Sequence, residues 1–283
     1  MRRLLPLLLA VSIPFIQNAV DARRGRYEAQ EEVLYLWSGQ HVRRLVPGLE
    51  ALFADIYWLR TVQYFGGQRA FAEGKRFDLL EPLVDITTTL DPRYTMAYRY
   101  GAVFLAEPPP AGAGQPEKAV ALLERGSLAN PTSWQMRQDW GFFVYFFLHD
   151  AVKASHILDE AAQIPGAPLW LRSSAADFLR RSGERETSRS IWQHIYEQTE
   201  GQMRANARFN LDRLDAADAV DAHQNAVTAF RDRFGRFPTT LQELSGVGLL
   251  RAPLVDPSQV PFHYDPATGA VSLSRQSHFW RAT

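Results

Sequence analysis

The residues that could carry catalysis or hold a metal are scattered along this chain. Of its seven histidines the closest pair, His149 and His156, is split by an expected turn at Asp150. No HExxH, GxSxG or SxxK motif occurs, and the glycines of GAVFLAEPPPAGAG lack the GxxxxGK[ST] order that cradles phosphate. The absence of cysteine excludes disulfides, thiolate metal sites and a cysteine nucleophile. We therefore expect no catalytic residue, no metal site and no cofactor, and we predict that the protein is not an enzyme.

The carboxylates form one conspicuous stripe near the end of the chain. Four aspartates follow one another at a spacing of three residues, with Arg208 and Arg213 nearby: Asp212, Asp215, Asp218 and Asp221. Residues at this spacing drift around a helix instead of converging on one point. We expect a solvated acidic face, and a site for a cation or a basic partner is the alternative. Glu81 and Asp85 share a helix face, and we expect them to be solvated as well.

The overall composition is that of a soluble globular protein. The chain has 283 residues, 46% of them hydrophobic and 22% charged, and 31 basic residues balance 31 acidic ones. These values exclude a disordered, a collagen-like or a polytopic membrane protein. They also argue against nucleic-acid binding, which requires a surplus of Lys and Arg.

The amino terminus has the pattern of a membrane anchor. Met1-Arg2-Arg3 precedes LLPLLLAVSIPFI, and the 17 residues from Leu4 to Val20 carry no charge. That length is at the lower limit for spanning about 30 Å of hydrocarbon. We expect residues 1–20 to be a retained transmembrane helix, with a cleaved signal peptide or a buried helix as alternatives. The rest of the chain would then lie outside the cytoplasm, in a periplasmic space.

Residues 21–48 are predicted to be a tether with one short strand at 33–36. From residue 49 the apolar residues recur at threes and fours, which predicts an amphipathic helix. Gly66-Gly67 argues against one unbroken helix there. We expect Ile56-Tyr57-Trp58 to pack on the first helical repeat and not at a membrane interface.

Three prolines mark a repeat. Pro92, Pro131 and Pro165 each follow a helix-like segment, at separations of 39 and 34 residues. The longer interval contains the insertion PPPAGAG, and removing about five residues from it restores the 34-residue period of a two-helix repeat. Within the intervals, small and large apolar residues recur in corresponding positions: Tyr98, Gly101, Leu105, Ala119 and Leu123, then Trp140, Gly141, Val144, Ala154 and Leu158.

These positions resemble the tetratricopeptide-repeat (TPR) family over about residues 49–215, with a weaker unit from Tyr64 and a fourth from Trp170. The resemblance implies a mainly α fold, an α-solenoid of antiparallel helix pairs. Small residues would allow close helix packing at four positions: Gly101, Ala119, Gly141 and Ala154.

Residues 216–283 are predicted to form a small α+β cap. We expect a helix over 216–234, a short helix over 240–244, and a β-hairpin around the turn DPATG of residues 265–269. The stretch FRDRFGRFPTTLQEL with the following PFHYDPATG is similar to the carboxy-terminal module of pilin-like secretion proteins. That similarity implies a place in a secretion or pilus-type assembly.

Seven aromatic residues crowd the fourteen positions from Trp134 to Phe147. We expect Trp140, Phe143 and Phe147 in the core, while core and groove remain equal alternatives for Phe142 and Tyr145. In the TPR family the first helix of each pair lines a concave surface, which implies a partner-binding groove made of Arg99, Val103, Gln138, Phe142 and Tyr145. The predicted function is a membrane-tethered scaffold for an unknown protein partner. The alternative is a carrier of a small molecule or acyl ligand inside the superhelix, with Arg99 at its site.

Overall fold

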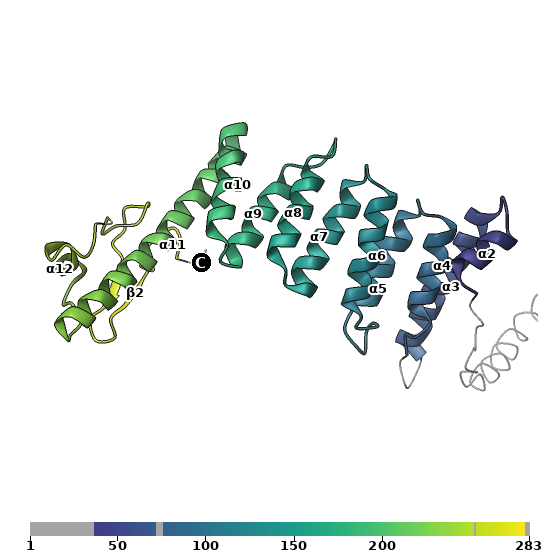
Figure 1. The fold of residues 1–283 in the computed structure, drawn as a ribbon, viewed down its shortest axis with the longest axis horizontal. Helices are drawn as coiled ribbons and strands as arrows, with labels where there is room; N and C mark the ends of the chain where they lie inside the picture. Colours follow the sequence, from purple (N-terminus) through teal and green to yellow (C-terminus); the bar gives the residue numbers. More distant parts are fainter. Residues whose placement is uncertain (1–36, 72–75, 252, 281–283) are drawn as a thin grey trace, which may run out of the picture. The chain divides into compact units, whose positions relative to one another are not determined.

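The computed structural model describes residues 37–71, 76–251 and 253–280, and this part of the chain is mainly helical (Figure 1). It contains eleven helices and one two-stranded antiparallel sheet near the carboxy terminus. Within the described ranges no helix is both long and apolar enough to cross a bilayer. The predicted anchor at 1–20 and the predicted strand at 33–36 lie outside the described residues.

The chain divides into two compact units, Met1–Gln115 and Pro116–Thr283. The described part of the first unit consists of four helices: α2 (Gly39–Leu45), α3 (Glu50–Phe71), α4 (Leu80–Leu90) and α5 (Thr95–Ala106). The prediction that residues 21–48 form a tether with one short strand is wrong for 39–45, which form α2. This short helix forms because it packs on α4, where Val42 is buried with Ile86 and Leu90.

Helix α3 continues unbroken through Gly66-Gly67, contrary to the prediction. Each helical glycine costs about 1 kcal/mol relative to alanine, and aromatic packing before the pair offsets this cost. The Phe65 ring stacks on Phe104 with 4.0 Å between centroids, and Trp58 stacks on the same ring at 6.1 Å. The predicted packing of Ile56-Tyr57-Trp58 within this unit is therefore observed for Tyr57 and Trp58, whereas Ile56 is 40% exposed.

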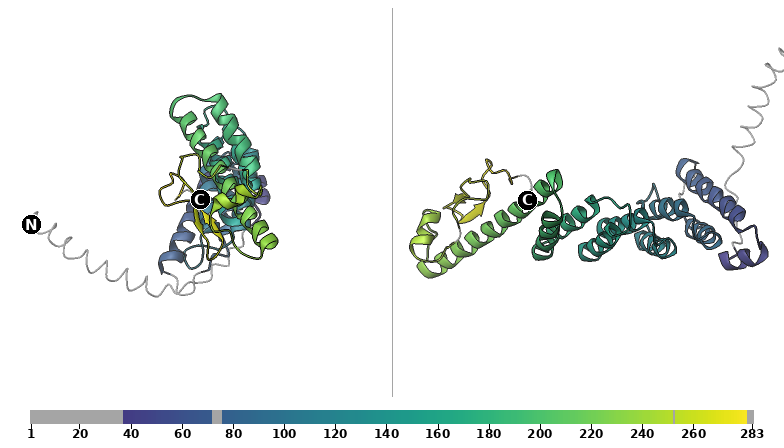
Figure 2. Two further views of the ribbon diagram at one scale, coloured as in Figure 1. Left: turned by 90° about the vertical axis from the view of Figure 1, so that its left-hand side faces the viewer. Right: turned by 90° about the horizontal axis from the view of Figure 1, so that it is seen from above.

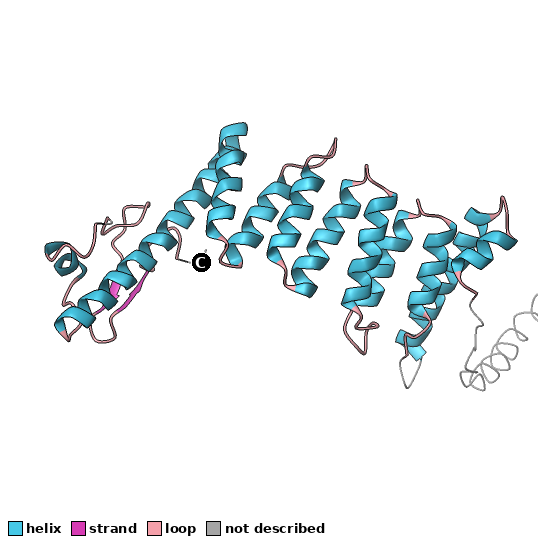
Figure 3. Ribbon diagram, viewed as in Figure 1, coloured by secondary structure: helices cyan, strands magenta, loops and turns pink. Residues whose placement is uncertain are grey.

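The second unit is a succession of helices in which each packs on the next (Figures 2 and 3). The helices are α6 (Pro116–Ala129), α7 (Trp134–Leu148), α8 (Ala151–Ala162), α9 (Trp170–Arg181), α10 (Arg185–Gln198) and α11 (Gly201–Phe234). The positions predicted for close helix packing are buried in both units. Ala119 and Ala154 are fully buried, and Gly101 and Gly141 are buried within α5 and α7.

Helix α11 is much longer than the predicted helix over 216–234 and begins at Gly201. After that first residue no proline and no glycine interrupts it before Gly235, whose φ of +70° ends the helix. Its first half packs on Trp192 and Ile195 through an apolar face that includes Leu211. The predicted boundary between repeats and cap at 215/216 thus falls inside one continuous helix.

The carboxy-terminal hairpin is confirmed, with β1 (His263–Asp265) antiparallel to β2 (Ala270–Ser272). A short helix α12 (Leu241–Gly246) precedes it, close to the predicted 240–244. The side-chain amide of Gln224 on α11 makes two hydrogen bonds to the hairpin. It donates to the Gly269 carbonyl and accepts from the Val271 N–H, each at 3.0 Å. The hairpin therefore packs along the second half of α11 around Phe230 and Val271 (Figure 1).

Candidate functional site

Three local devices fix the ends of α7 and the start of α8. Ser133 accepts a hydrogen bond from the Met136 N–H at the start of α7, and Asp150 accepts one from the Lys153 N–H at the start of α8. Between the helices His149 takes the left-handed conformation, with φ of 55°. These caps stop α7 and start α8 at defined residues, which sets the rotation of both helices.

Gly141 lies at a close contact between α7 and α8. A Cβ atom at this position would lie 2.8 Å from Leu158 Cδ2 and 3.3 Å from the Ala154 carbonyl oxygen. Because Gly141, Val144 and Met136 are buried on this side, the aromatic residues of α7 must occupy its other faces.

Five aromatic side chains of α7 and α9 form one continuous cluster, which we call the aromatic surface: Phe142, Tyr145, Phe146, Trp170 and Phe178. Tyr145 lies flat on Phe178, with 3.6 Å between ring centroids, and Phe142 stacks on Trp170 at 6.3 Å. Phe178 is buried beneath the others, whereas Phe146 is 60% exposed and Trp170 41%. The cluster thus presents large apolar rings to solvent on a fixed base.

The remaining rings of α7 lie elsewhere. Phe143 packs on Phe147 at 5.1 Å, and both are half-buried, as is Trp140. The indole Nε1 of Trp140 is buried without a hydrogen-bond partner. The expectation that all three are core residues is therefore met only in part.

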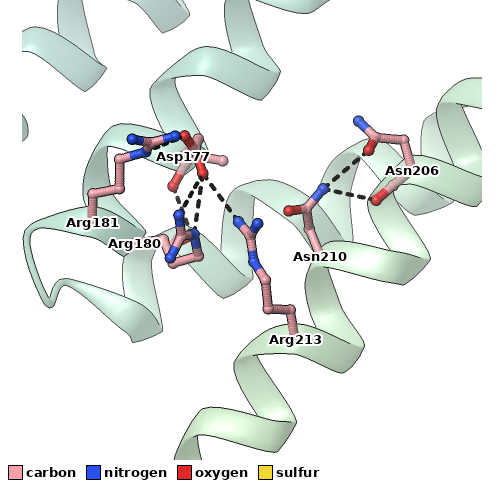
Figure 4. Close-up of polar contacts among 8 residues, drawn as sticks. Asp177, Arg180, Arg181, Asn206, Asn210 and Arg213 are labelled. Atoms are coloured by element: carbon pink, nitrogen blue, oxygen red, sulfur yellow. Dashed lines mark hydrogen bonds and ion pairs between the residues drawn. The ribbon is translucent and has the colours of Figure 1, made fainter. Parts of the chain in front are cut away.

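A charged cluster beside the aromatic surface joins α9 to α11 (Figure 4). Asp177, the residue before Phe178, accepts hydrogen bonds from Arg181 at 2.7 Å, Arg180 at 3.1 Å and Arg213 at 3.0 Å. Burial acts to raise the pKa of Asp177, but the Arg181 hydrogen bond and the Arg180 charge outweigh it, and the pKa lies below its ordinary value. One carboxylate faces three guanidinium groups, so this cluster of four side chains keeps a net positive charge.

Arg181 extends this positive charge to the aromatic surface. Its side chain is largely exposed, and its guanidinium lies near Tyr145. Arg213 on α11 is instead almost buried, and its Nε has no hydrogen-bond partner. Asn206 and Asn210 lie one turn apart at the same joint, where the Asn210 amide donates to the Asn206 carbonyl at 2.9 Å (Figure 4).

The predicted groove residues fall into the two units. Phe142 and Tyr145 lie together in the aromatic surface, and half-buried Gln138 lies one turn earlier on the same helix. Arg99 and Val103 are exposed on α5 of the first unit, where Arg99 has interactions of its own. Phe142 and Tyr145 are both half-buried and both pack on Phe178, so neither is a fully buried core residue.

Sequence reasoning missed three members of the surface. Phe146 follows Phe142 by four residues and therefore shares its helix face, which is a signal the sequence contains. Trp170 and Phe178 belong to α9, which packs on α8. Their contacts with Phe142 and Tyr145 of α7 depend on that packing, which the sequence pattern does not show.

The aspartate stripe is neutralised from within the chain. Arg185 on α10 pairs with Asp218 at 3.1 Å and with Asp221 at 2.5 Å. Arg189, one turn later, pairs with Asp215 and with Asp218. Asp212 pairs with Arg208, while Arg213 pairs with Asp177 on α9 and not with the stripe. Arginines of helix α10 in the same chain therefore occupy the place that a basic partner would take beside these aspartates.

One pocket of about 760 Å³ lies in the first unit, beside the proline-rich loop. It is lined by Arg76, Phe77, Asp78, Pro109, Pro110, Gly112, Ala113 and Gln115, and Arg99 does not line it. Over residues 37–71, 76–251 and 253–280, no group of three or more histidine or carboxylate side chains is placed to hold a metal ion.

Neither a protein-family model nor a curated protein matches this chain.

Proposed function

We propose that this protein is a TPR-like α-solenoid scaffold, held at a membrane by residues 1–20, that binds a partner polypeptide on its aromatic surface. The succession of short helices in which each packs on the next supports the solenoid. The proposal places the folded part outside the cytoplasm, because a basic amino terminus precedes the apolar segment.

The observation that carries the binding role is the exposure of Phe146 and Trp170 on a rigid base. Large rings supply much contact area for few rotatable bonds, and aromatic and arginine side chains dominate the binding energy of protein interfaces. Arg181 at the edge adds a cation that favours an acidic residue in the partner. The chemistry therefore fits an apolar segment of a polypeptide with a carboxylate beside its anchoring side chains.

The carboxy-terminal cap supports a narrower role. The cap consists of α12 and the hairpin along α11, and it is the part that resembles pilin-like secretion proteins. On this resemblance we propose a role in a secretion or pilus-type assembly. Loss of the gene should then reduce piliation or secretion, and unchanged levels of both would end this part of the proposal.

The binding role is tested with a photo-crosslinking amino acid in the full chain in its native membrane. Placed at Phe146, it should yield a discrete polypeptide adduct, and the additional change Trp170→Ser should reduce that adduct at least about tenfold. The matched control is Leu128, an exposed apolar residue on α6 at 78% exposure. Equal labelling from both positions would mean random collision and would remove the aromatic surface as a binding site.

The ligand-carrier alternative has its own readout. A carrier should release a co-purified small molecule of defined mass in native mass spectrometry of the purified chain. A scaffold should show no such mass and should retain a polypeptide instead.

A further inference from the structure

Helix α3 is apolar on two opposite faces. Ala54, Thr61 and Phe65 are buried against the rest of the first unit. On the far side of the helix Leu52, Ile56 and Leu59 are 54%, 40% and 59% exposed. A helix that serves only as the outer layer of a domain carries polar residues on its far side. The outer face of α3 therefore has the composition of a second packing surface.

The outer residues have the spacing of a coiled-coil seam. They alternate at intervals of four and three residues along most of the helix: Leu52, Ile56, Leu59, Gln63, Gly66 and Ala70. This 3.5-residue average is the period at which two helices stay in contact as they wind around each other. We call these six residues the α3 seam. Gly66 has open space around its Cβ position, and all six are exposed.

The charges beside the seam are complementary between copies. Asp55 and Arg60 lie on opposite edges, five residues apart. In two parallel helices paired in register, a residue just before an a position meets the residue five later on the other helix. Asp55 of one copy would thus face Arg60 of the other, twice across the two-fold axis. Tyr94 lies near the Asp55 carboxylate, and Arg60 has no ion pair among the described residues.

We propose that the α3 seam binds the same seam of a second copy of this chain, as a parallel two-helix pair. The seam extends over about 27 Å at 1.5 Å per residue, so the contact is modest in area. Two features favour a second copy over a lipid surface. The edges carry one acid and one base, and the stripe includes Gln63 and the small residues Gly66 and Ala70, which suit close helix approach and not lipid chains.

The absence of cysteine makes the test direct. Leu52→Cys and Leu59→Cys, each alone in the full chain in detergent and in bilayers, should form disulfide-linked dimers on mild oxidation. In a parallel pair in register each seam residue meets its own copy, within the Cα separation a disulfide requires. Tyr100→Cys on α5, 51% exposed in the same unit, is the control. We expect at least about a tenfold higher dimer yield at positions 52 and 59 than at position 100.

Charge reversal tests the register. Asp55→Arg in the Leu59→Cys chain should lower the dimer yield, because it places two arginines opposite each other, and adding Arg60→Asp should restore it. Circular dichroism should show the same helix content for every variant, since both side chains are exposed. An antiparallel pair would not bring Asp55 opposite Arg60 and would not show this rescue.

Three results would overturn the proposal. Equal yields at positions 59 and 100 would mean that no second copy occupies the seam. A fluorophore at position 59 quenched by brominated lipid, with no excess crosslinking, would assign the seam to the membrane. The third result concerns the Leu59→Cys thiol. If it reacts faster with a thiol reagent after deletion of residues 1–20 than before, and no crosslinked dimer forms, the apolar amino-terminal segment covers the seam. None of these outcomes depends on the partner crosslink at Phe146, which tests a different unit of the chain.

Discussion

At the scale of single residues, Gly141 shows how the lack of a side chain determines a helix contact. Its Cβ position lies 2.8 Å from Leu158 Cδ2, closer than side chains in folded proteins approach each other. The pattern of small residues in the sequence identified this position, but it did not identify Leu158 as the side chain that a larger residue would meet.

We predict that Gly141→Leu lowers the free energy of unfolding by about 3 kcal/mol, because the new side chain overpacks the contact with α8. Urea unfolding of the full chain in mild detergent measures the change. Gly67→Ala is the control, since nothing lies within 4 Å of its Cβ position, and it should stabilise α3 by up to about 1 kcal/mol. An unchanged midpoint for Gly141→Leu would show that α7 and α8 do not meet at this residue.

Asp256 is a buried carboxylate that organises the end of the chain without a cation. It accepts hydrogen bonds from the Ser258 N–H at 2.8 Å, the Ser258 hydroxyl at 2.7 Å, the Val260 N–H at 3.0 Å and the Ser277 hydroxyl. Burial acts to raise the pKa of Asp256, but these hydrogen bonds outweigh it and leave the pKa below its ordinary value.

This lowered pKa gives a pH dependence with a definite sign. The ionised carboxylate stabilises the fold above the unfolded-state pKa of about 3.9, and the contribution disappears as the pH falls through the lower folded-state pKa. Asp256→Asn should therefore lower the free energy of unfolding by about 1–3 kcal/mol at pH 7. At pH 3 the difference between variant and parent should shrink. Melting temperatures at both pH values measure it, and an equal difference at both would contradict the assignment.

At the scale of elements, the joint between α9 and α11 depends on Asp177. Its carboxylate pairs with Arg213, whose side chain is almost buried, and also with Arg180 and Arg181 on its own helix (Figure 4). Removing the anion leaves a guanidinium group with little access to water, which costs more than the ion pair itself contributes.

We predict that Asp177→Asn destabilises the protein by about 2 kcal/mol, a value reduced from that of fully buried pairs because Asp177 is partly exposed. The control is Asp212→Asn, which breaks a pair whose arginine, Arg208, is 62% exposed and keeps its water, so it should cost less than about 0.5 kcal/mol. Chemical unfolding of both variants at low and high salt separates the two cases. An equally small loss of stability in both variants would mean that the Arg213 guanidinium becomes hydrated when the Asp177 carboxylate is removed.

The elements also show which local signals were sufficient. The turn residues of DPATG placed the hairpin and the apolar period placed α3, because both signals act within a few residues, while the proline spacing indicated the helix pairs that follow. Helix α2 and the first half of α11 were missed. Each is weakly marked by its own sequence and forms where other elements cover it, α4 in one case and α10 in the other.

At the scale of the full chain, the proposed anchor makes a prediction about the remaining residues. Deleting residues 1–20 should release a soluble protein that keeps its helix content, because each unit has a buried apolar core of its own. Circular dichroism and size-exclusion chromatography of the deleted form measure this. Aggregation of that form would place the amino-terminal segment in the core instead.

Features that depend on near neighbours could be predicted from the amino-acid sequence. They are a mainly helical chain, the helix ends at proline and glycine, the small residues at helix contacts, and the carboxy-terminal hairpin. The sequence also located the aromatic segment from which the aromatic surface is built. These features follow from hydrophobic period, capping and turn chemistry, which act within about one or two helix turns.

Contacts between residues far apart in the sequence depend on tertiary packing, so local sequence patterns could not predict them. Packing paired the aspartate stripe with Arg185 and Arg189, stacked Tyr145 on Phe178, and left one face of α3 uncovered. The partners in these contacts are separated by about thirty residues, and their meeting depends on where each helix returns along its neighbour. The energy of each contact is small beside that of helix packing, so helix packing selects the pairs and the sequence pattern alone does not reveal them.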